Sequence, residues 1–494
     1  MLTGLALRLF CFVYFPAVTD DSRIYADLAT NWLQHGIYGQ RQAEKEIEPT
    51  DTRLPGYPAF LAAIFCLFGA GNFRAVMLTQ ILIDLATCLI IADLARRMVS
   101  ERAARIAFVL AALCPFLANY SVAGLTETLE IFFTALALDG AVAALNRMRD
   151  ASAKKMDVRK LWAATGAAIA ACILLRPDGG ILLAAVLLYM ALAAPKGAVD
   201  FVQLVASLKR CPDTKLETGQ RTKVEFCRSP LTAGIIVAAF ALAPLVPWTI
   251  RNFHTLHHFQ PLAPRYANEP DELVPRGFNR WVKTWIIDYA SVEEIYWNVP
   301  GDKIDPQKLP SRATENSNEK DAILAAIADY NETQIMTPEL DTRFGQLAAD
   351  RIRAHPVRYY IVLPLLRVAD MWLRPRTEIL PPDVRWWEFN DDAKYSIMAV
   401  GFGVLNLAYV GAALLALIRR KSRRPSGIRW SGFLVTFLLL RSAFLLTLEN
   451  PEPRYTLECY PALIVLASSL LARNKRVGTG LCSVQSGRSP ASTR

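Results

Sequence analysis

Histidine is scarce in this sequence, and the cysteines are scattered along it. The nine cysteines include no Cys-x-x-Cys pair and no cysteine–histidine pair at a metal-ligand spacing, so we expect neither a structural zinc site nor a disulfide framework. Most of the cysteines lie inside apolar runs, where a thiol behaves as a small hydrophobic group. They are Cys11, Cys66, Cys88, Cys114, Cys172, Cys211, Cys227, Cys459 and Cys482.

Motifs for nucleotides and for catalytic zinc are also absent. The chain has no GxxxxGK followed by Ser or Thr, no GxGxxG after a strand, and no HExxH among its five histidines. These motifs hold phosphates or zinc, so their absence argues against an ATP-driven enzyme and a zinc peptidase. No internal repeat is visible, which disfavours transporters built from inverted repeats.

Charged residues are scarce, and long apolar runs take their place. Of the 494 residues, 20% are charged and 53% are hydrophobic. A helix of about 20 apolar residues crosses a bilayer, and these runs are too continuous for barrel strands. We therefore expect an all-α polytopic membrane protein with about 10–12 transmembrane helices. The apolar segments are 1–18, 57–70, 73–97, 104–120, 126–146, 161–175, 179–195, 231–250, 359–374, 395–418, 430–448 and 456–472.

The net charge of +10 is explained if the basic residues gather on the cytoplasmic side of a membrane. Basic clusters follow the apolar segments that end near 97, 146, 195, 418 and 472, as the positive-inside rule predicts. Because they flank hydrophobic helices, they give no support for nucleic-acid binding. With a cytoplasmic N-terminus, this pattern requires that the short segments 57–70 and 359–374 do not cross the membrane. Either they lie in the interface or re-enter on the same side, or one pair of spans is miscounted. The polar loops expected outside are 19–56, the turn at Glu127, 176–178, 251–358, 375–394 and 449–455.

This pattern divides the chain into parts. Residues 1–250 form a predicted transmembrane catalytic module whose first outer loop is 19–56, and residues 359–473 form further transmembrane helices. Residues 251–358 are a predicted extracytoplasmic segment, either a small, mainly helical domain or several loop helices. The polar parts expected inside are the loop 196–230 and a disordered tail, 474–494.

The first apolar segment, 1–18, is slightly short and contains Arg8. It lacks a basic leader and a clear small-x-small cleavage site, so it is not a convincing signal peptide. Either Arg8 faces the protein interior, or the protein begins upstream of Met1.

Two adjacent carboxylates, Asp20 and Asp21, follow this segment. Asp is a favoured N-terminal cap, so the pair could begin a helix over 22–34. Alternatively, a carboxylate at a membrane surface could deprotonate an acceptor hydroxyl. Tyr25 lies on the same helix face as Asp21, four residues later.

Three arginines, Arg53, Arg251 and Arg454, stand near the ends of apolar segments on the predicted outer side. Interfacial arginines are ordinary at a membrane boundary. A guanidinium also binds phosphate in a bidentate way, so the three together could neutralise a lipid phosphate or pyrophosphate.

Glu127 and Glu130 open the apolar segment 126–146. Acidic residues suit the first turn of a helix, with Thr126 as its cap. A carboxylate at membrane depth is costly, however, and suggests a function. For the other charged residues in apolar segments, we favour polar links between helices or the ends of spans. These are Asp84, Asp93, Asp139, Arg367, Asp370 and Arg441.

Taken in order, these motifs resemble the polyprenol-phosphate-dependent glycosyltransferases of the GT-C fold. The resemblance is to bacterial members of family 39, which include lipid A aminoarabinose transferase and relatives of the protein O-mannosyltransferases. No single motif is specific, but the ordered set is typical of the superfamily. The motifs are Asp21-x-x-x-Tyr25, Gly36-Ile37-Tyr38-Gly39, Arg53-x-Pro55-Gly56-Tyr57-Pro58, Thr126-Glu127-Thr128, Arg176-Pro177, Pro247-Trp248-Thr249-Ile250-Arg251-Asn252, and Pro453-Arg454-Tyr455 with Pro461.

The resemblance implies inverting transfer of a sugar from a polyprenyl phosphate to a hydroxyl of an envelope lipid, glycan or protein, outside the inner membrane. Asp21 matches the key acid, with Asp20 as its rival, and Glu127 matches a second acid. The family's large C-terminal soluble domain has no counterpart here, which leaves 251–358 as its candidate replacement. The residues assigned to substrate binding are Arg53, Tyr57, Arg251, Arg454 and Tyr455.

Two other classes remain: a transporter or lipid flippase that uses the same acids, and a polytopic scaffold. No cofactor is expected, although paired acids could hold Mg²⁺ or Mn²⁺. The expected partners are a polyprenyl-phosphate sugar donor and membrane lipids, with no nucleic acid. The sugar, the acceptor and the oligomeric state cannot be read from the sequence.

Overall fold

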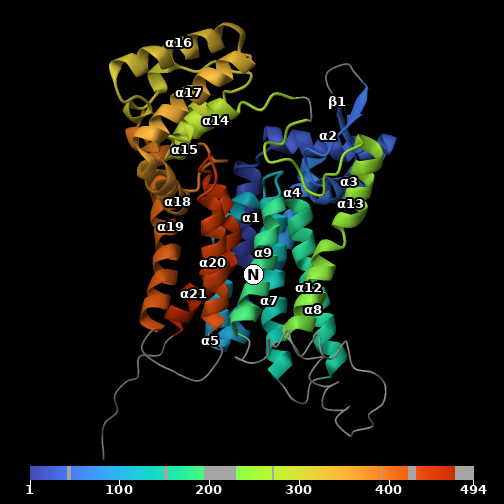
Figure 1. The fold of residues 1–494 in the computed structure, drawn as a ribbon. Helices are drawn as coiled ribbons and strands as arrows, with labels where there is room; N and C mark the ends of the chain where they lie inside the picture. The colour runs from blue at the N-terminus through green and yellow to red at the C-terminus, as the bar shows by residue number, and fades with distance from the viewer. Residues whose placement is uncertain are drawn as a thin grey trace, which may run out of the picture.

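The protein is a bundle of helices in a computed structural model (Figure 1). The structure describes residues 1–41, 46–149, 154–193, 230–269, 272–390, 392–420 and 430–472. The predicted tail 474–494 lies outside the described residues, and so does the predicted loop 196–230 apart from its last residue. Within the described ranges, the named strands are β1 (Gly39–Arg41) and β2 (Ile47–Pro49), which pair antiparallel.

Every predicted apolar segment contains a helix, which confirms the all-α polytopic membrane fold. In the described parts of the chain, five helices are long and apolar enough to cross a membrane: α4, α7, α8, the continuous stretch Pro230–Leu256, and α19. The single segment predicted at 104–120 is instead two helices, because Pro115 has no N–H to continue the first one. The bundle helices are α1 (Leu2–Tyr14), α3 (Gly56–Phe68), α4 (Phe73–Met98), α5 (Glu101–Ala112), α6 (Pro115–Tyr120), α7 (Glu127–Arg149), α8 (Lys155–Leu175), α9 (Gly180–Ala193), α12 (Pro230–Leu242), α13 (Leu245–Leu256), α18 (Leu363–Leu373), α19 (Ala393–Arg420), α20 (Trp430–Leu445) and α21 (Tyr460–Leu471).

Arg8 faces the protein interior, one of its two predicted outcomes. Its side chain is fully buried and donates to the Asp84 carboxylate across 2.6 Å. It also donates to the carbonyl of Ala112 at 2.8 Å. A buried charge needs such partners, and these contacts join α1 to α4 and to the end of α5.

A second hydrophobic core lies outside the bundle helices, within the segment 276–354. Phe278, Trp281, Trp285 and Phe344 are fully buried there. In Figure 1, the helices of this segment lie at the same end of the bundle as α2 and β1. The helical elements of the segment are α14 (Arg276–Val282), α15 (Tyr289–Ser291), a π-helical turn (Val292–Tyr296), 3₁₀ turns (Pro306–Lys308 and Ser311–Ala313), α16 (Ser317–Thr333) and α17 (Pro338–Ala354).

The helix expected at 22–34 begins earlier, as α2 (Asp20–His35), and its cap is Thr19 rather than either aspartate. The Thr19 side chain accepts from the backbone N–H of Ser22, and the Ser22 side chain accepts from the N–H of Thr19. This reciprocal box satisfies the first N–H groups of the helix. Neither Asp20 nor Asp21 is therefore needed as a cap.

Candidate active site

Two backbone contacts bring distant polar loops together. Ala17, just before α2, donates to the carbonyl of Val122 and accepts from the N–H of Gly124, both at 3.0 Å. The start of α2 therefore lies beside the start of α7. Gly56 packs on the end of α8, where a Cβ would lie 2.5 Å from the Leu174 carbonyl oxygen. Only glycine fits that approach, which holds the Arg53 loop against the turn that follows α8.

Asp21 lies between two of the predicted arginines. Its Oδ1 accepts from Arg53 Nη2 at 3.3 Å, and its Oδ2 accepts from Arg454 Nη2 at 3.4 Å. Burial alone would raise the pKa of Asp21, but the charges of Arg454 and Arg53 outweigh it and hold this pKa below its ordinary value. Asp21 is therefore ionised, and two cations converge on it.

Arg454 extends this cluster to Glu127, the second predicted acid. Its Nη1 lies 3.8 Å from Glu127 Oε1, and its Nε lies 2.5 Å from Glu452 Oε2. Glu127 is 3% exposed, and Arg176 Nη1 lies 3.8 Å from the same oxygen of Glu127. Tyr455 also donates to Glu452. Glu452 therefore holds both Arg454 and Tyr455 within the last polar loop, 449–455.

The cluster continues through ion pairs that the sequence did not reveal. Arg176 Nε lies 3.5 Å from both Glu130 Oε1 and Asp178 Oδ1. Arg441 is fully buried and binds Asp178 at 2.6 Å and Glu458 at 2.7 Å. Arg441 is thus a polar link between helices, as expected, but it belongs to the same network as Asp21. The carboxylates of Glu130, Asp178 and Glu458 are close enough together to hold a metal ion.

A cavity of about 980 Å³ lies over this network. Six of the eight predicted site residues line it: Asp20, Asp21, Arg53, Glu127, Arg454 and Tyr455. Ile24, Leu54, Leu175, Ile379 and Phe444 add an apolar part to its wall. A cavity with both charged and apolar walls can hold the charged and the apolar part of one amphiphilic molecule.

The structure places three predicted residues differently. Asp20 also lines the cavity, but its side chain is 91% exposed and pairs with Arg23 at 2.8 Å. Tyr57 is not among the lining residues; it is buried and donates to Gln80 at 2.8 Å. It also stacks edge-on against Tyr25, which does line the cavity. The third residue is Arg251.

Arg251 is not among the residues that line the cavity. Its guanidinium donates to the carbonyls of Tyr38 at 2.6 Å and Thr50 at 2.8 Å, and it lies over the rings of Tyr38 and Trp248. These contacts hold the residues just before β1 and just after β2 against α13. The predicted trio of phosphate-binding arginines is therefore a pair here, Arg53 and Arg454, with Arg176 nearby in the lining.

Glu378 is a further carboxyl group in the cavity wall that the sequence did not single out. Its Oε2 accepts from the Tyr120 hydroxyl at 3.3 Å, while its buried Oε1 has no hydrogen-bond partner. Burial raises the pKa of Glu378 to about 7, although Arg376 opposes the shift. The sequence does not distinguish Glu378 from the other acidic residues of the polar loop 375–394.

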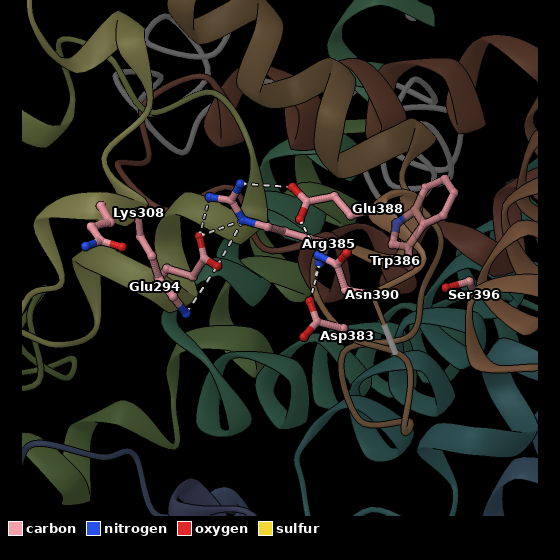
Figure 2. Close-up of a pocket in the computed structure, with 9 residues that line it drawn as sticks. Glu294, Lys308, Asp383, Arg385, Trp386, Glu388, Asn390 and Ser396 are labelled. Atoms are coloured by element: carbon pink, nitrogen blue, oxygen red, sulfur yellow. Dashed lines mark hydrogen bonds and ion pairs between the residues drawn. The ribbon is translucent and has the colours of Figure 1, made fainter. Parts of the chain in front are cut away.

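A separate, smaller pocket of about 300 Å³ lies between the π-helical turn and the loop before α19 (Figure 2). There Arg385 donates to both oxygens of Glu294, at 3.0 and 2.7 Å, and to Glu388 at 3.1 Å. Lys308 also contacts Glu294, at 3.5 Å. These charges neutralise one another, and none of the predicted site residues lines this pocket.

Comparisons with known proteins agree with the expected resemblance. The family model described as dolichyl-phosphate-mannose-protein mannosyltransferase matches residues 49–208. This range includes Arg53, Glu127 and Arg176. The match confirms the resemblance to GT-C glycosyltransferases of the protein-mannosyltransferase type. No curated protein sequence matches the chain.

Several solved structures match weakly over most of the chain. ArnT from Cupriavidus metallidurans bound to undecaprenyl phosphate is 15% identical, with a TM-score of 0.36, over 95% of this chain and 76% of that one. The oligosaccharyltransferase of Archaeoglobus fulgidus in complex with Zn and sulfate is 13% identical, with a TM-score of 0.46, over 95% of this chain and 48% of that one. AglB from Archaeoglobus fulgidus with an inhibitory peptide and a dolichol-phosphate is 13% identical, with a TM-score of 0.36, over 95% of this chain and 56% of that one.

Proposed function

We propose that the protein is an inverting glycosyltransferase that moves a sugar from a polyprenyl phosphate to a hydroxyl of an envelope lipid, glycan or protein. The observation that carries this proposal is the placement of Asp21 between Arg53 and Arg454 in the wall of one amphipathic cavity. The match to a dolichyl-phosphate-mannose-dependent family supports the same donor class.

The donor phosphate would bind at Arg53 and Arg454, because both line the cavity. A phosphate that accepts their N–H groups competes with Asp21 for them. Asp21 would then lose part of its cationic neighbourhood and become a stronger base at the moment when the sugar is in place. Asp21 would thus bind the two arginines in the absence of the donor and release them when the donor phosphate binds.

The transfer itself then needs one proton acceptor and charge stabilisation. Asp21 takes the proton of the acceptor hydroxyl as its oxygen attacks the anomeric carbon. The bond from that carbon to the phosphate oxygen breaks on the opposite face, which inverts the configuration. Arg53 and Arg454 stabilise the negative charge that gathers on the departing lipid phosphate. Glu127 holds Arg454 and Arg176 in position.

We place the reaction on the outer face of the inner membrane. The cavity is lined by Asp21 of α2 and by Tyr289 of the 276–354 segment. Figure 1 shows these two parts at the same end of the bundle. The basic pair Arg96-Arg97 closes the last turn of α4, a position that the positive-inside rule assigns to the cytoplasm. Lipid-linked sugars on the outer face need no nucleotide, in agreement with the lack of nucleotide motifs in the sequence.

The most direct test is a comparison of lipid-linked sugars and envelope glycans by mass spectrometry, with and without the gene. We expect one polyprenyl-phosphate sugar to accumulate and one envelope product to lose a terminal sugar. The accumulated donor would distinguish a hexosyl from a pentosyl transferase. Unchanged donor and product pools would overturn the proposal.

The main alternative, a transporter or flippase, makes a different prediction about access. Labelling of a cysteine introduced at position 21 with a membrane-impermeant reagent separates the two. A transferase should react only from the outside, whereas a flippase should react from each side in turn.

A further inference from the structure

The ion-pair network under the cavity carries an unbalanced charge. Its ion pairs connect six carboxylates to four guanidiniums, which leaves two negative charges when all groups are ionised. An anionic lipid phosphate would be repelled by such a site. The members are Asp21, Glu127, Glu130, Asp178, Glu452 and Glu458, with Arg53, Arg176, Arg441 and Arg454.

Three of the six acids, Glu130, Asp178 and Glu458, lie together. One carboxylate oxygen of each lies within 4.8 Å of the other two. Glu130 is 1% exposed, and neither of its oxygens accepts a hydrogen bond. The Oδ1 atom of Asp178 also lacks a hydrogen-bond partner. Buried carboxylate oxygens without donors are costly, so this arrangement points to a cation between them.

The nearby guanidiniums do not fully neutralise these three carboxylates. Arg441 is already bound to Asp178 Oδ2 and Glu458 Oε1, which leaves Asp178 Oδ1 on the side of Glu130. Arg176 Nε approaches that side only to 3.5 Å from each of the two acids. Its charge is shared with Glu127, 3.8 Å away.

We propose that Glu130, Asp178 and Glu458 bind one hard divalent cation, of the Mg²⁺, Mn²⁺ or Ca²⁺ class. All three ligands are carboxylate oxygens, which these cations prefer over softer metals. Two oxygens bound to one cation at 2.3–2.5 Å lie at most about 4.6–5 Å apart, and the three carboxylate oxygens lie within 4.8 Å of one another. One divalent cation also cancels the two excess charges of the network.

The site lies next to the reaction centre rather than within it. Asp178 lines the cavity, whereas Glu130 and Glu458 do not. The cation would therefore neutralise the floor of the cavity and fix Arg176 through Asp178, without contact to the sugar. The binding of the cation does not depend on the proposed transfer, so the two can fail separately.

The test uses full-length protein in detergent, stripped with EDTA and titrated with Mn²⁺ in the absence of any sugar donor. We expect one Mn²⁺ per chain by calorimetry or electron paramagnetic resonance, and an increase in the unfolding temperature. The double variant Glu130→Gln/Glu458→Gln removes two charges while it keeps the side-chain volumes. It should fold without metal, bind no Mn²⁺ and be insensitive to EDTA.

Asp329→Asn is the matched control, because Asp329 is an exposed acid of α16 paired with Arg343. It should bind Mn²⁺ as the wild type does. The rival explanation is that two protons are shared among the same carboxyl groups. If stripped wild-type protein binds no Mn²⁺, Mg²⁺ or Ca²⁺ at millimolar concentrations, and shows proton uptake instead, the cation site is wrong.

Discussion

Arg454 donates to Asp21 although 433 residues separate them in the chain. The contact joins the first polar loop to the last one, and both residues line the cavity. The same guanidinium pairs with Glu127 at the start of α7. Three loops that the sequence separates widely are therefore held by one side chain, and the charge of Asp21 depends on all of them.

Asp21→Asn should reduce turnover by at least about 10²-fold, because an amide cannot accept the proton of the acceptor hydroxyl. The variant should still fold, since an amide oxygen can accept from Arg53 or Arg454. The measurement is the rate of sugar transfer per mole of purified protein, with the unfolding temperature as the check on folding. Asp20→Asn is the control: its exposed side chain pairs with Arg23, so most of the activity should remain. Near-normal turnover of Asp21→Asn would remove Asp21 from the mechanism.

Arg53→Ala should weaken donor binding by about 10–100-fold, the range expected for the loss of a charge-assisted hydrogen bond. It should also change the pH profile. Arg53 helps to hold the pKa of Asp21 down, so its removal raises that pKa, and the acidic limb of kcat/KM moves to higher pH. Arg53→Lys should restore part of the affinity and return the limb toward its original position. A variant with unchanged donor affinity would argue against a phosphate contact.

Glu378 should make the protein less stable as the pH rises toward neutrality. Its pKa is raised by burial to about 7, from 4.5 for an ordinary glutamate. Between these values the folded protein binds the proton and the unfolded chain does not, so the contribution of Glu378 to stability is lost as the pH increases through this window. The loss is at most about 3 kcal/mol.

Glu378→Gln tests this dependence, because it keeps the neutral form at every pH. We expect the wild type and the variant to have similar unfolding temperatures near pH 4.5, with the variant more stable above pH 7. Tyr120→Phe removes the hydroxyl that contacts Glu378 and should leave the direction of the pH dependence unchanged. Parallel curves for wild type and Glu378→Gln would contradict the shifted pKa.

Much of the site could be predicted because its residues stand at helix ends. Hydrophobic length and the distribution of basic residues place Asp21, Arg53, Glu127 and Arg454 at one end of the bundle, before any contact is known. Arg53 and Arg251 could not be separated in this way, since both are arginines at the ends of apolar segments. Their partners differ: Arg251 donates to the carbonyls of Tyr38 and Thr50, which flank the β1–β2 hairpin about 200 residues earlier in the chain.

The acid–arginine network beneath the cavity could not be predicted from the sequence either, because its members do not differ in sequence context from ordinary polar links between helices. Glu458 precedes α21 and Arg441 lies within α20, and each alone fits an ordinary polar link between helices. That they meet Asp178 depends on how these helices are rotated about their axes. The rotation is set by packing among apolar side chains of similar size, which hydrophobicity does not distinguish.

The buried pair of Arg8 and Asp84 should behave as a unit. Asp84→Leu or Arg8→Met alone leaves an uncompensated buried charge and should destabilise the protein by about 3–5 kcal/mol. The double variant has no charge to desolvate, so most of the loss should be recovered. Recovery will be incomplete, because Arg8 also donates to the Ala112 carbonyl. Unfolding in detergent, followed for the wild type, both single variants and the double variant, gives the coupling energy. If the two single effects simply add in the double variant, the pair contributes no coupling, and α1 is held to α4 by apolar packing alone.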